Sequence, residues 1–337
     1  MVGIVNHVYP VILSSIQLLR LYDHLKAKMQ NPRPSLIVIT GPTGVGKTDL
    51  AIRLAEKFDG EIISADSMQV YRYLDIGTAK PSAEEQACVP HHLIDVVDPD
   101  EEFNAAMFVE QADVAIHSLH ERGKRAFIVG GTGLYLDALL GGLLEAPGAD
   151  EKLRDFYREE AARYGKGYLY GRLKEIDPAA AVGIHPNDQV RTIRALEVME
   201  QTGQSIVSIQ GEHRFGSKAY DCMKIGLTID RDLLYDRIND RVERMIADGL
   251  VGEGERLLKM GYDDEDLPLQ AMTYRNVISY TRGNQSLQDM VRLIKRDTRH
   301  YARRQLTWFR RDPDIKWFAP QDENMISRAV KSRVLGY

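Results

Sequence analysis

The chain contains the stretch Leu36-Ile37-Val38-Ile39-Thr40-Gly41-Pro42-Thr43-Gly44-Val45-Gly46-Lys47-Thr48, and this stretch decides the fold. Its apolar first part, Leu36 to Thr40, is too short for a typical helix and predicts a buried parallel strand. The part from Gly41 to Thr48 fits the phosphate-loop pattern G-x-x-x-x-G-K-[ST], which requires a strand before it and a helix after it. The order strand, glycine-rich loop, helix therefore predicts a P-loop α/β core.

The glycine-rich loop is the first candidate site. Glycines let backbone N–H groups converge on phosphate oxygens, Lys47 neutralises their charge, and the Thr48 hydroxyl can hold Mg²⁺. A turn without a ligand is the weaker alternative, because the flanking strand and helix are demanding requirements. We expect eight residues to form the phosphate site: Gly41, Pro42, Thr43, Gly44, Val45, Gly46, Lys47 and Thr48.

Strands and helices alternate on both sides of this loop. The next helix is predicted from Asp49 to Phe58, because Leu50, Leu54 and Phe58 recur on one face. A helix is also predicted from its N-cap Asn104 to its C-cap Gly123. Further strands are predicted at Glu61 to Ala65, His92 to Val96 and Ala126 to Val129. This alternation predicts a parallel sheet flanked by helices.

The pattern changes to helices alone in the middle of the chain. Helical segments are expected near Asp150 to Tyr164, Gly167 to Ile176 and Asp188 to Thr202. A strand at Lys224 to Ile229, a helix capped by Asp230, a long helix at Ser286 to Arg311 and an edge strand at Ile315 to Phe318 follow. The predicted fold is a P-loop NTPase-like core with an inserted all-helical domain. Its parts are an extension at 1–34, a core at 35–140 and 217–320, an insertion at 141–216 and a tail at 321–337.

Composition restricts the class of protein. The 337 residues carry a formal charge of −5, so a nucleic-acid surface must be a local basic patch. The two cysteines, Cys88 and Cys222, lack the spacing of a disulfide framework or a zinc site. The apolar stretch Val8 to Leu19 is too short to cross a bilayer, which needs about 20 residues. We expect a cytoplasmic protein without an obligate protein partner. Its N-terminal extension is expected to be disordered or non-native, since Met29 could equally be the start.

A lone acid stands out at the carboxyl edge of the predicted sheet. The strand Ala126 to Val129 runs into Gly130 without the acidic residue of an ordinary P-loop NTPase, which makes nucleotide hydrolysis less favoured. Asp66 instead follows the second strand, at the edge where α/β proteins bind ligands. From the residues alone, this carboxylate fits a general base, a metal ligand or a helix N-cap equally well.

Several further motifs resemble bacterial tRNA dimethylallyltransferases, and the resemblance spans residues 36 to about 318. The motifs are Asp66-Ser67-Met68-Gln69-Val70-Tyr71, Asp75-Ile76-Gly77-Thr78-Ala79-Lys80-Pro81, Val129-Gly130-Gly131-Thr132-Gly133-Leu134-Tyr135, Ile184-His185-Pro186-Asn187-Asp188 through Arg191, Arg194 and Glu197, and Arg303-Arg304-Gln305-Leu306-Thr307-Trp308-Phe309-Arg310. One departure lies at Met272-Thr273-Tyr274-Arg275, where a small apolar residue and a glycine are expected before the tyrosine.

The resemblance implies transfer of a dimethylallyl group from dimethylallyl diphosphate to the exocyclic amine of the adenosine 3′-adjacent to the anticodon in tRNA. It implies Mg²⁺ as cofactor, and dimethylallyl diphosphate and the tRNA anticodon stem-loop as partners. An adenine amine is a weak nucleophile, so a base that takes its proton is useful. A prenyltransferase acting on free adenine nucleotides, a P-loop small-molecule kinase and a noncatalytic RNA-binding switch remain alternatives.

Individual roles follow from the matched positions. Asp66 matches the family's general base, Thr43 a position near the diphosphate, and Arg241 an arginine that contacts it; Arg237 is a weaker candidate. From helical spacing alone, we would pair these arginines with Asp236 or Asp240 instead. The positions that match tRNA contacts are Asp66, Ser67, Met68, Gln69, Thr132, Arg154, Val190, Arg191, Thr192, Ile193 and Arg194.

Two basic segments have competing interpretations. Arg191 and Arg194 lie one helical turn apart and fit phosphate contacts, but their spacing favours ion pairs with Asp188, Glu197 or Glu200. The last long helix, Arg292 to Arg311, holds eight basic residues against one acid. Its aromatic residues fit core packing better than nucleic-acid contact, so whether this helix binds tRNA stays open.

Overall fold

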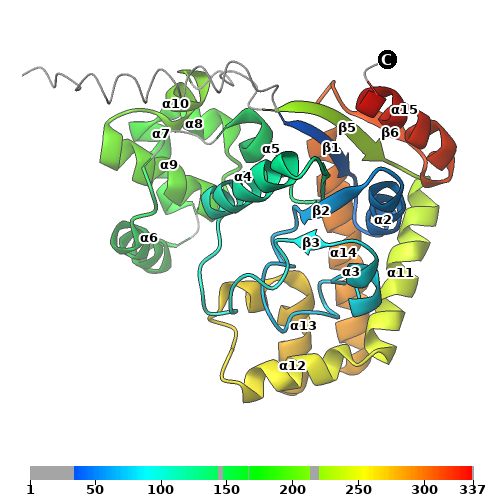
Figure 1. The fold of residues 1–337 in the computed structure, drawn as a ribbon. Helices are drawn as coiled ribbons and strands as arrows, with labels where there is room; N and C mark the ends of the chain where they lie inside the picture. The colour runs from blue at the N-terminus through cyan, green and yellow to red at the C-terminus, as the bar shows by residue number, and fades with distance from the viewer. Residues whose placement is uncertain (1–33, 143–146, 166, 213–219, 336–337) are drawn as a thin grey trace, which may run out of the picture.

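A parallel sheet forms the centre of the molecule (Figure 1). The computed structural model describes residues 34–142, 147–165, 167–212 and 220–335. Within these residues the sheet has six strands in the order β3-β2-β4-β1-β5-β6. Their bounds are β1 Ser35–Thr40, β2 Gly60–Ser64, β3 His91–His92, β4 Arg125–Gly130, β5 Asp221–Leu227 and β6 Lys316–Phe318. The predicted fold class, a P-loop-type parallel sheet with an all-helical insertion, is confirmed.

The strand β1 lies between β4 and β5 and is buried on both faces. Leu36 and Val38 pack into one apolar core with helices α4 (Ala105–Glu121) and α5 (Gly133–Gly141). Ile37 and Ile39 pack into the other core with helices α2 (Lys47–Lys57) and α11 (Arg231–Ala247). Because side chains alternate along a strand, a near-continuous apolar run is what two covered faces require.

The predicted strand at His92 to Val96 is much shorter in the structure. Pairing with β2 is limited to His91 and His92, which lie opposite Ile62 and Ile63. Leu93 has a φ of 62° and Asp95 a φ of 54°, so the backbone leaves the extended region at these positions. This left-handed geometry is uncommon for residues other than glycine, and the apolar pattern does not reveal it. The prediction was therefore wrong beyond the first residue of the segment.

The remaining helices of the core lie around the end of the sheet at which the strands have their carboxyl ends (Figure 1). Their bounds are α3 Ala83–Cys88, α12 Leu250–Lys259, α13 Met272–Thr281 and α14 Leu287–Phe309, with short 3-10 turns η1 Leu267–Gln270 and η2 Pro320–Asp322. Asp230 caps α11 and Ser286 caps α14 through side-chain acceptors, as predicted for Asp230. Helix α14 runs past the loops of the central strands and so brings a distant part of the sequence to them.

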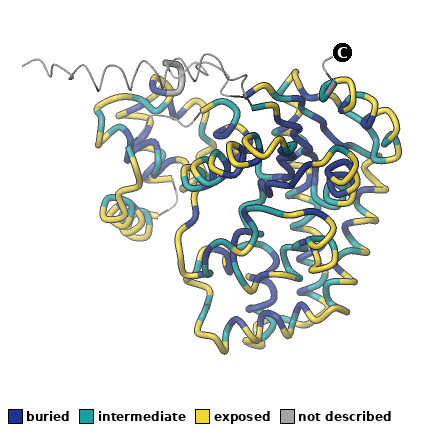
Figure 2. Tube along the Cα trace, in the orientation of Figure 1, coloured by how far each residue is buried: buried dark blue, intermediate teal, exposed yellow. Residues whose placement is uncertain are grey.

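All the secondary structure in the described part of the middle segment is helical, and short loops join the helices. They are α6 Glu151–Tyr164, α7 Tyr168–Ile176, α8 Pro178–Gly183, α9 Gln189–Thr202 and α10 Ile206–Glu212. They share a small apolar core of their own, which includes Tyr157, Leu173 and Leu196. Figure 2 shows that the outer helix α6 is largely exposed, and Tyr157 is its one buried residue. The short helices α8 and α10 were not predicted.

The end of the chain, for which we predicted only a tail, contains helix α15 (Glu323–Leu335). Ile326 and Val330 are fully buried in the core that α2 and β5 also line. The predicted extension lies outside the described residues except for Pro34. Among the described helices, none is long and apolar enough to cross a membrane.

Candidate active site

The phosphate loop joins β1 to α2, as the motif predicts. Gly41, Gly44 and Gly46 have positive φ values of 142°, 80° and 99°. A Cβ at Gly41 would lie 2.6 Å from the Leu227 carbonyl oxygen, so both space and conformation require glycine there. Val45 is fully buried and anchors the loop in the core. The motif residues therefore shape the backbone, and Val45 can offer a ligand only its main chain.

The Lys47 side chain folds over the loop that carries it. Its ammonium donates to the carbonyl oxygens of Gly41 and Pro42 at 3.0 and 2.9 Å. Burial lowers the pKa of Lys47 to about 8, the Asp66 carboxylate opposes this shift, and Arg241 adds to it. The charge on Lys47 therefore interacts with both Asp66, the candidate base, and Arg241, the candidate diphosphate-binding residue.

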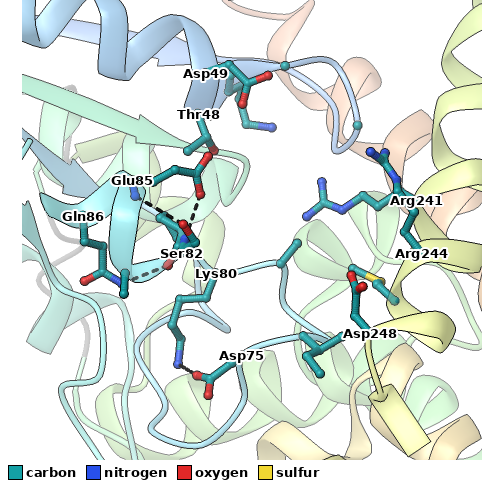
Figure 3. A pocket seen from close by; sticks show the side chains of 18 of the residues that line it. Thr48, Asp49, Asp75, Lys80, Ser82, Glu85, Gln86, Arg241, Arg244 and Asp248 are labelled. Carbon is teal, nitrogen blue, oxygen red and sulfur yellow. Dashed lines mark hydrogen bonds and ion pairs between the residues drawn. The ribbon is translucent and has the colours of Figure 1, made fainter. Parts of the chain in front are cut away.

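A cavity of about 1350 Å³ opens beside the loop. Arg241 and Arg244 extend from α11 toward it, and Thr48 and Asp49 lie on the opposite wall (Figure 3). Among the described residues, no carboxylate lies within ion-pair distance of Arg241 or Arg237, although we weighed pairing with neighbouring acids. Burial lowers the pKa of Arg241, and Asp66 opposes the shift. Partly buried cations without acidic partners are typical of an anion site.

Arg237 is the more exposed of the two arginines and occupies a different position. Its guanidinium donates to the Val45 carbonyl oxygen at 3.4 Å, and the side chain also lines the cavity. It therefore contacts the backbone of the phosphate loop itself. This arrangement agrees with its rank as the weaker candidate.

Asp66 follows β2 and lies at the carboxyl edge of the sheet. Its Oδ1 accepts the Met68 N–H at 2.9 Å and closes a turn, so the carboxylate caps a turn and not a helix. Its negative charge opposes the lowering of the pKa of Lys47 and Arg241 that burial causes. The same charge adds to the effect of burial on Tyr301, and together they raise the pKa of Tyr301 to about 12. The carboxylate thus lies among the cations of the site and remains half-exposed.

The neighbours of Asp66 differ in what they leave free. The Ser67 N–H donates to Thr132 Oγ1 at 3.0 Å, which joins the turns after β2 and β4. The Gln69 amide is fully engaged, because it accepts from Ser64 and donates to the carbonyl oxygens of the Thr78–Ala79 segment. Gln69 therefore orders the protein in this structure, and a contact of its side chain with tRNA would require these bonds to change.

The arginines of the helical insertion, expected to act alike, differ in their surroundings. Glu197 has a fully buried carboxylate, and it binds Arg154 at 2.9 Å and Arg194 at 2.5 Å. Arg194 also donates to the Pro147 carbonyl oxygen at 2.7 Å. Arg191 instead is 62% exposed, and its ion pair with Asp188 is longer, at 3.4 Å. The ion-pair interpretation therefore fits Arg154 and Arg194, whereas Arg191 is accessible to a ligand.

The other predicted tRNA residues of the insertion separate in the same way. Thr192 and Ile193 are buried, with 1% and 7% of their surface exposed, while Val190 is 81% exposed. Of the predicted positions from Val190 to Arg194, only Val190 and Arg191 are mostly exposed.

A second, basic groove of about 480 Å³ lies between α9 and α14. It is lined by Arg191, His300, Arg303, Arg304, Thr307, Trp308 and Arg311. Basic residues of α14 up to Arg299 have partners, such as the ion pair of Lys295 with Glu243 and the hydrogen bond of Arg299 to Asn239. Within the part of the chain that the structure describes, the groove arginines of α14 have no ion-pair partner. Because the chain as a whole carries a negative net charge, any surface for nucleic acid must be a local basic patch. Helix α14 forms such a patch at this groove.

Two residues that sequence reasoning gave no role shape the site. Glu253 of α12 has a buried carboxylate that accepts the N–H groups of Asp75, Ile76 and Gly77 at 3.0, 2.9 and 3.0 Å. The Tyr274 hydroxyl donates to the same carboxylate at 2.6 Å. Glu253 thereby holds a loop that lines the cavity, and Tyr274 is fully buried although its segment departs from the family pattern. The second residue is Gln305, which joins two loops of the site.

The carboxylates that line the cavity, those of Asp49, Asp75, Glu85, Asp95 and Asp248, do not gather into a metal site. No cluster of three histidine, cysteine or acidic side chains suited to a metal occurs in the described ranges. The Thr48 hydroxyl lines the cavity at the start of α2. A hydroxyl next to a phosphate site fits Mg²⁺, which keeps several water ligands and binds largely through substrate phosphates.

Comparison with known proteins yields a consistent set of relatives. The family model described as IPP transferase matches residues 69–312. A protein of Syntrophus aciditrophicus named tRNA dimethylallyltransferase 2 is 55% identical over 296 residues, which cover 88% of this chain and 95% of the relative. A tRNA dimethylallyltransferase of Geobacter sulfurreducens is 51% identical over 85% of this chain and 92% of its own length.

Solved structures show the same likeness. The tRNA isopentenylpyrophosphate transferase of Bacillus halodurans superposes with a TM-score of 0.67 at 42% identity, over 90% of this chain and 97% of the other. A eukaryotic dimethylallyltransferase described as acting on tRNA superposes with a TM-score of 0.74 at 31% identity, over 88% of this chain and 77% of the other.

Proposed function

The chain belongs to the IPP transferase family, and we propose that it transfers a dimethylallyl group from dimethylallyl diphosphate to the exocyclic amine of the adenosine 3′-adjacent to the anticodon in tRNA. That the chain is a tRNA-modifying transferase follows from its likeness to tRNA dimethylallyltransferases over most of its length. The donor, the target adenosine and the roles of individual residues are the proposed parts. Because tRNA is the acceptor, we place the reaction in the cytoplasm.

One observation carries the choice of donor. Lys47 and Arg241 lie beside a single cavity, and neither has a carboxylate within ion-pair distance among the described residues. Together with the N–H groups of the loop and the start of α2, they form a site for a ligand with more than one negative charge. A diphosphate satisfies this requirement, and the cavity, with a total volume of about 1350 Å³, also has room for an organic group.

The proposed chemistry is a displacement at the first carbon of the dimethylallyl group. The bond from this carbon to the diphosphate oxygen breaks, and its electron pair leaves with the diphosphate. The bond from the adenine amine nitrogen to the carbon forms, and Asp66 accepts the proton that the amine loses. Lys47, the loop N–H groups and Arg241 stabilise the charge that develops on the leaving diphosphate.

Mg²⁺ would be held by the Thr48 hydroxyl together with oxygens of the diphosphate. It would supply additional positive charge for the leaving group. The residues present fit this role, because a substrate-borne Mg²⁺ needs few protein ligands.

The acceptor side follows from the position of the carboxylate. Asp66 lies on the turn that follows β2 and is half-buried, and enzymes that act on a base inside a nucleic-acid stack generally take that base out of the stack. We therefore propose that the target base leaves its stack, at a cost of a few kcal/mol. The groove between α9 and α14, lined by Arg191 and by arginines of α14 that have no ion pair among the described residues, would hold the phosphates of the anticodon stem-loop.

The deciding experiment offers the purified protein labelled dimethylallyl diphosphate with Mg²⁺ and either tRNA, free adenine nucleotides or no acceptor. We expect label in tRNA alone, and none when the target adenosine is replaced. Label in the free nucleotide would favour a prenyltransferase of the free-nucleotide class. Phosphoryl transfer from ATP without prenylation of tRNA would favour the kinase.

A further inference from the structure

A single buried carboxamide joins the two halves of the proposed site. Gln305 of α14 is 5% exposed. Its Oε1 accepts the backbone N–H of Thr43 at 2.8 Å, and its Nε2 donates to the Gly131 carbonyl oxygen at 2.9 Å. A side chain from a helix far along the chain thereby connects the phosphate loop with the turn that follows β4.

The turn after β4 is in turn connected to the acceptor side. The Thr132 N–H donates to the Ala65 carbonyl oxygen at 3.2 Å, and Thr132 Oγ1 accepts the Ser67 N–H at 3.0 Å. Asp66 lies between these two anchored residues. Hydrogen bonds and short backbone links therefore connect the loop that would bind the diphosphate, through Gln305, with the backbone on either side of Asp66, whose carboxylate would take the proton.

The space around the carboxamide is adapted to it. A Cβ on residue 131 would lie 2.1 Å from the Gln305 Nε2, so glycine at this position makes the contact possible. The opposite face of α14 lines the basic groove with His300, Arg303 and Thr307. One helix therefore contacts the donor loop with its inner face and presents the proposed tRNA surface with its outer face.

We propose that Gln305 is a positioning residue that fixes the separation between the bound diphosphate ester and Asp66. This inference rests on the proposed function. Its first consequence is that the Thr43 N–H is committed to Gln305, which leaves the later N–H groups of the loop to the phosphates. Its second consequence is chemical: glutamate lacks the donor, and methionine, of similar size, lacks both the donor and the acceptor.

The test compares Gln305→Met and Gln305→Glu with Gln288→Met, a matched control at an exposed position on the same helix. Steady-state kinetics with both substrates varied, the melting temperature and the stoichiometry of tRNA binding are measured for each. Because misplacement by about 1 Å can cost about 100-fold, we expect kcat per tRNA-binding site to fall by that order in Gln305→Met. Both KM values should stay within about threefold of the wild type, since neither substrate loses a direct contact.

Gln305→Glu should lower kcat as well and should also raise the KM for dimethylallyl diphosphate, because it adds a carboxylate beside the phosphate loop. If Gln305→Met does not fold, this variant carries the same comparison. A lowered melting temperature with wild-type kcat per binding site would overturn the inference and leave Gln305 a packing role. An inactive wild type would overturn the proposed function and the inference with it, whereas an active wild type with unchanged Gln305 variants overturns only the inference.

Discussion

Asp66 is the residue on which the proposed chemistry depends most. Its Oδ1 accepts the Met68 N–H, so Asp66→Asn keeps an oxygen for the turn but cannot accept a proton. We expect turnover with saturating substrates to fall by roughly 10²- to 10⁴-fold, the usual contribution of a positioned base. The melting temperature and the affinity for tRNA should not change. Turnover near that of the wild type would identify Asp66 as a residue of the turn only.

The charge of Lys47 predicts a pH dependence. Burial lowers its pKa to about 8, so the free enzyme carries the ammonium below this pH and loses it above. We expect kcat/KM for dimethylallyl diphosphate to decline as the pH rises through about 8, because this parameter reports on the free enzyme. The bound diphosphate favours the charged form, so kcat should persist to higher pH. A kcat/KM that stays flat to about one unit above this pKa would contradict the prediction.

Arg241 offers a contrast with its neighbour one helical turn away. It lies beside the cavity without an acidic partner in the described structure, whereas Arg237 is exposed and contacts Val45. Arg241→Ala should raise the KM for dimethylallyl diphosphate by roughly 10- to 100-fold, corresponding to about 1.5–3 kcal/mol for a charge-assisted hydrogen bond. The KM for tRNA should change little. Arg237→Ala serves as the control, and an equal rise of both KM values in Arg241→Ala would contradict a diphosphate role.

At the scale of elements, helix α9 gives different surroundings to two arginines, Arg191 and Arg194, that each lie three residues from an acid in the sequence. Arg191 is 62% exposed at the basic groove, while Arg194 binds the buried Glu197. Arg191→Ala should flatten the slope of log affinity for tRNA against log salt by about 0.7 to 0.9, the value for one phosphate contact. Arg194→Ala should leave the slope unchanged and lower the melting temperature, because it leaves a buried carboxylate short of a partner.

Each α9 variant is the control for the other, since both remove one arginine from the same helix. Salt titrations of tRNA binding and thermal melts of the two proteins decide the matter. Equal changes in slope would show that Arg194 releases Glu197 to contact tRNA, and an unchanged slope in both would place tRNA on α14 alone.

At the scale of the whole molecule, the basic groove resolves an apparent conflict. The chain has a net charge of −5, yet it must hold a polyanion. The structure separates the charges, because basic residues in the first half of α14, such as Arg292 and Lys295, have ion pairs with acids, whereas the groove arginines of α14 have none among the described residues. If the groove is the tRNA surface we propose, association with tRNA depends on one face of the molecule and not on its overall charge.

The C-terminal helix has a role in stability that the site does not share. Ile326 of α15 is fully buried in the core that α2 and β5 also line, and α15 contributes no residue to the lining of the cavity or of the basic groove. Ile326→Ala should lower the free energy of unfolding by about 2–5 kcal/mol, the usual cost of truncating a buried isoleucine. At temperatures where the variant is folded, both KM values should equal those of the wild type. Met325→Ala, at a position 59% exposed, is the control for which denaturant unfolding should show little change.

The sequence by itself determined the features whose causes are local. The glycines of the phosphate loop, the apolar run of β1 and the cap of α11 depend on the conformation of a few neighbouring residues, so their pattern predicts them. The fold class and the family followed from such motifs in order along the chain. The local pattern failed at His92 to Val96, because apolar residues do not reveal the left-handed turns at Leu93 and Asp95.

Only the tertiary structure decided which charged and polar groups are free. Gln305 contacts Thr43 across 262 positions, and Glu253 binds the Asp75 N–H across 178, so no spacing in the sequence could associate them. Arg191 and Arg194 each lie three residues from an acid, but only Arg194 binds a buried carboxylate and a backbone carbonyl of another segment. The physical reason is that the contacts and exposure of a polar side chain are set by which distant elements pack around it, and packing is a property of the complete fold.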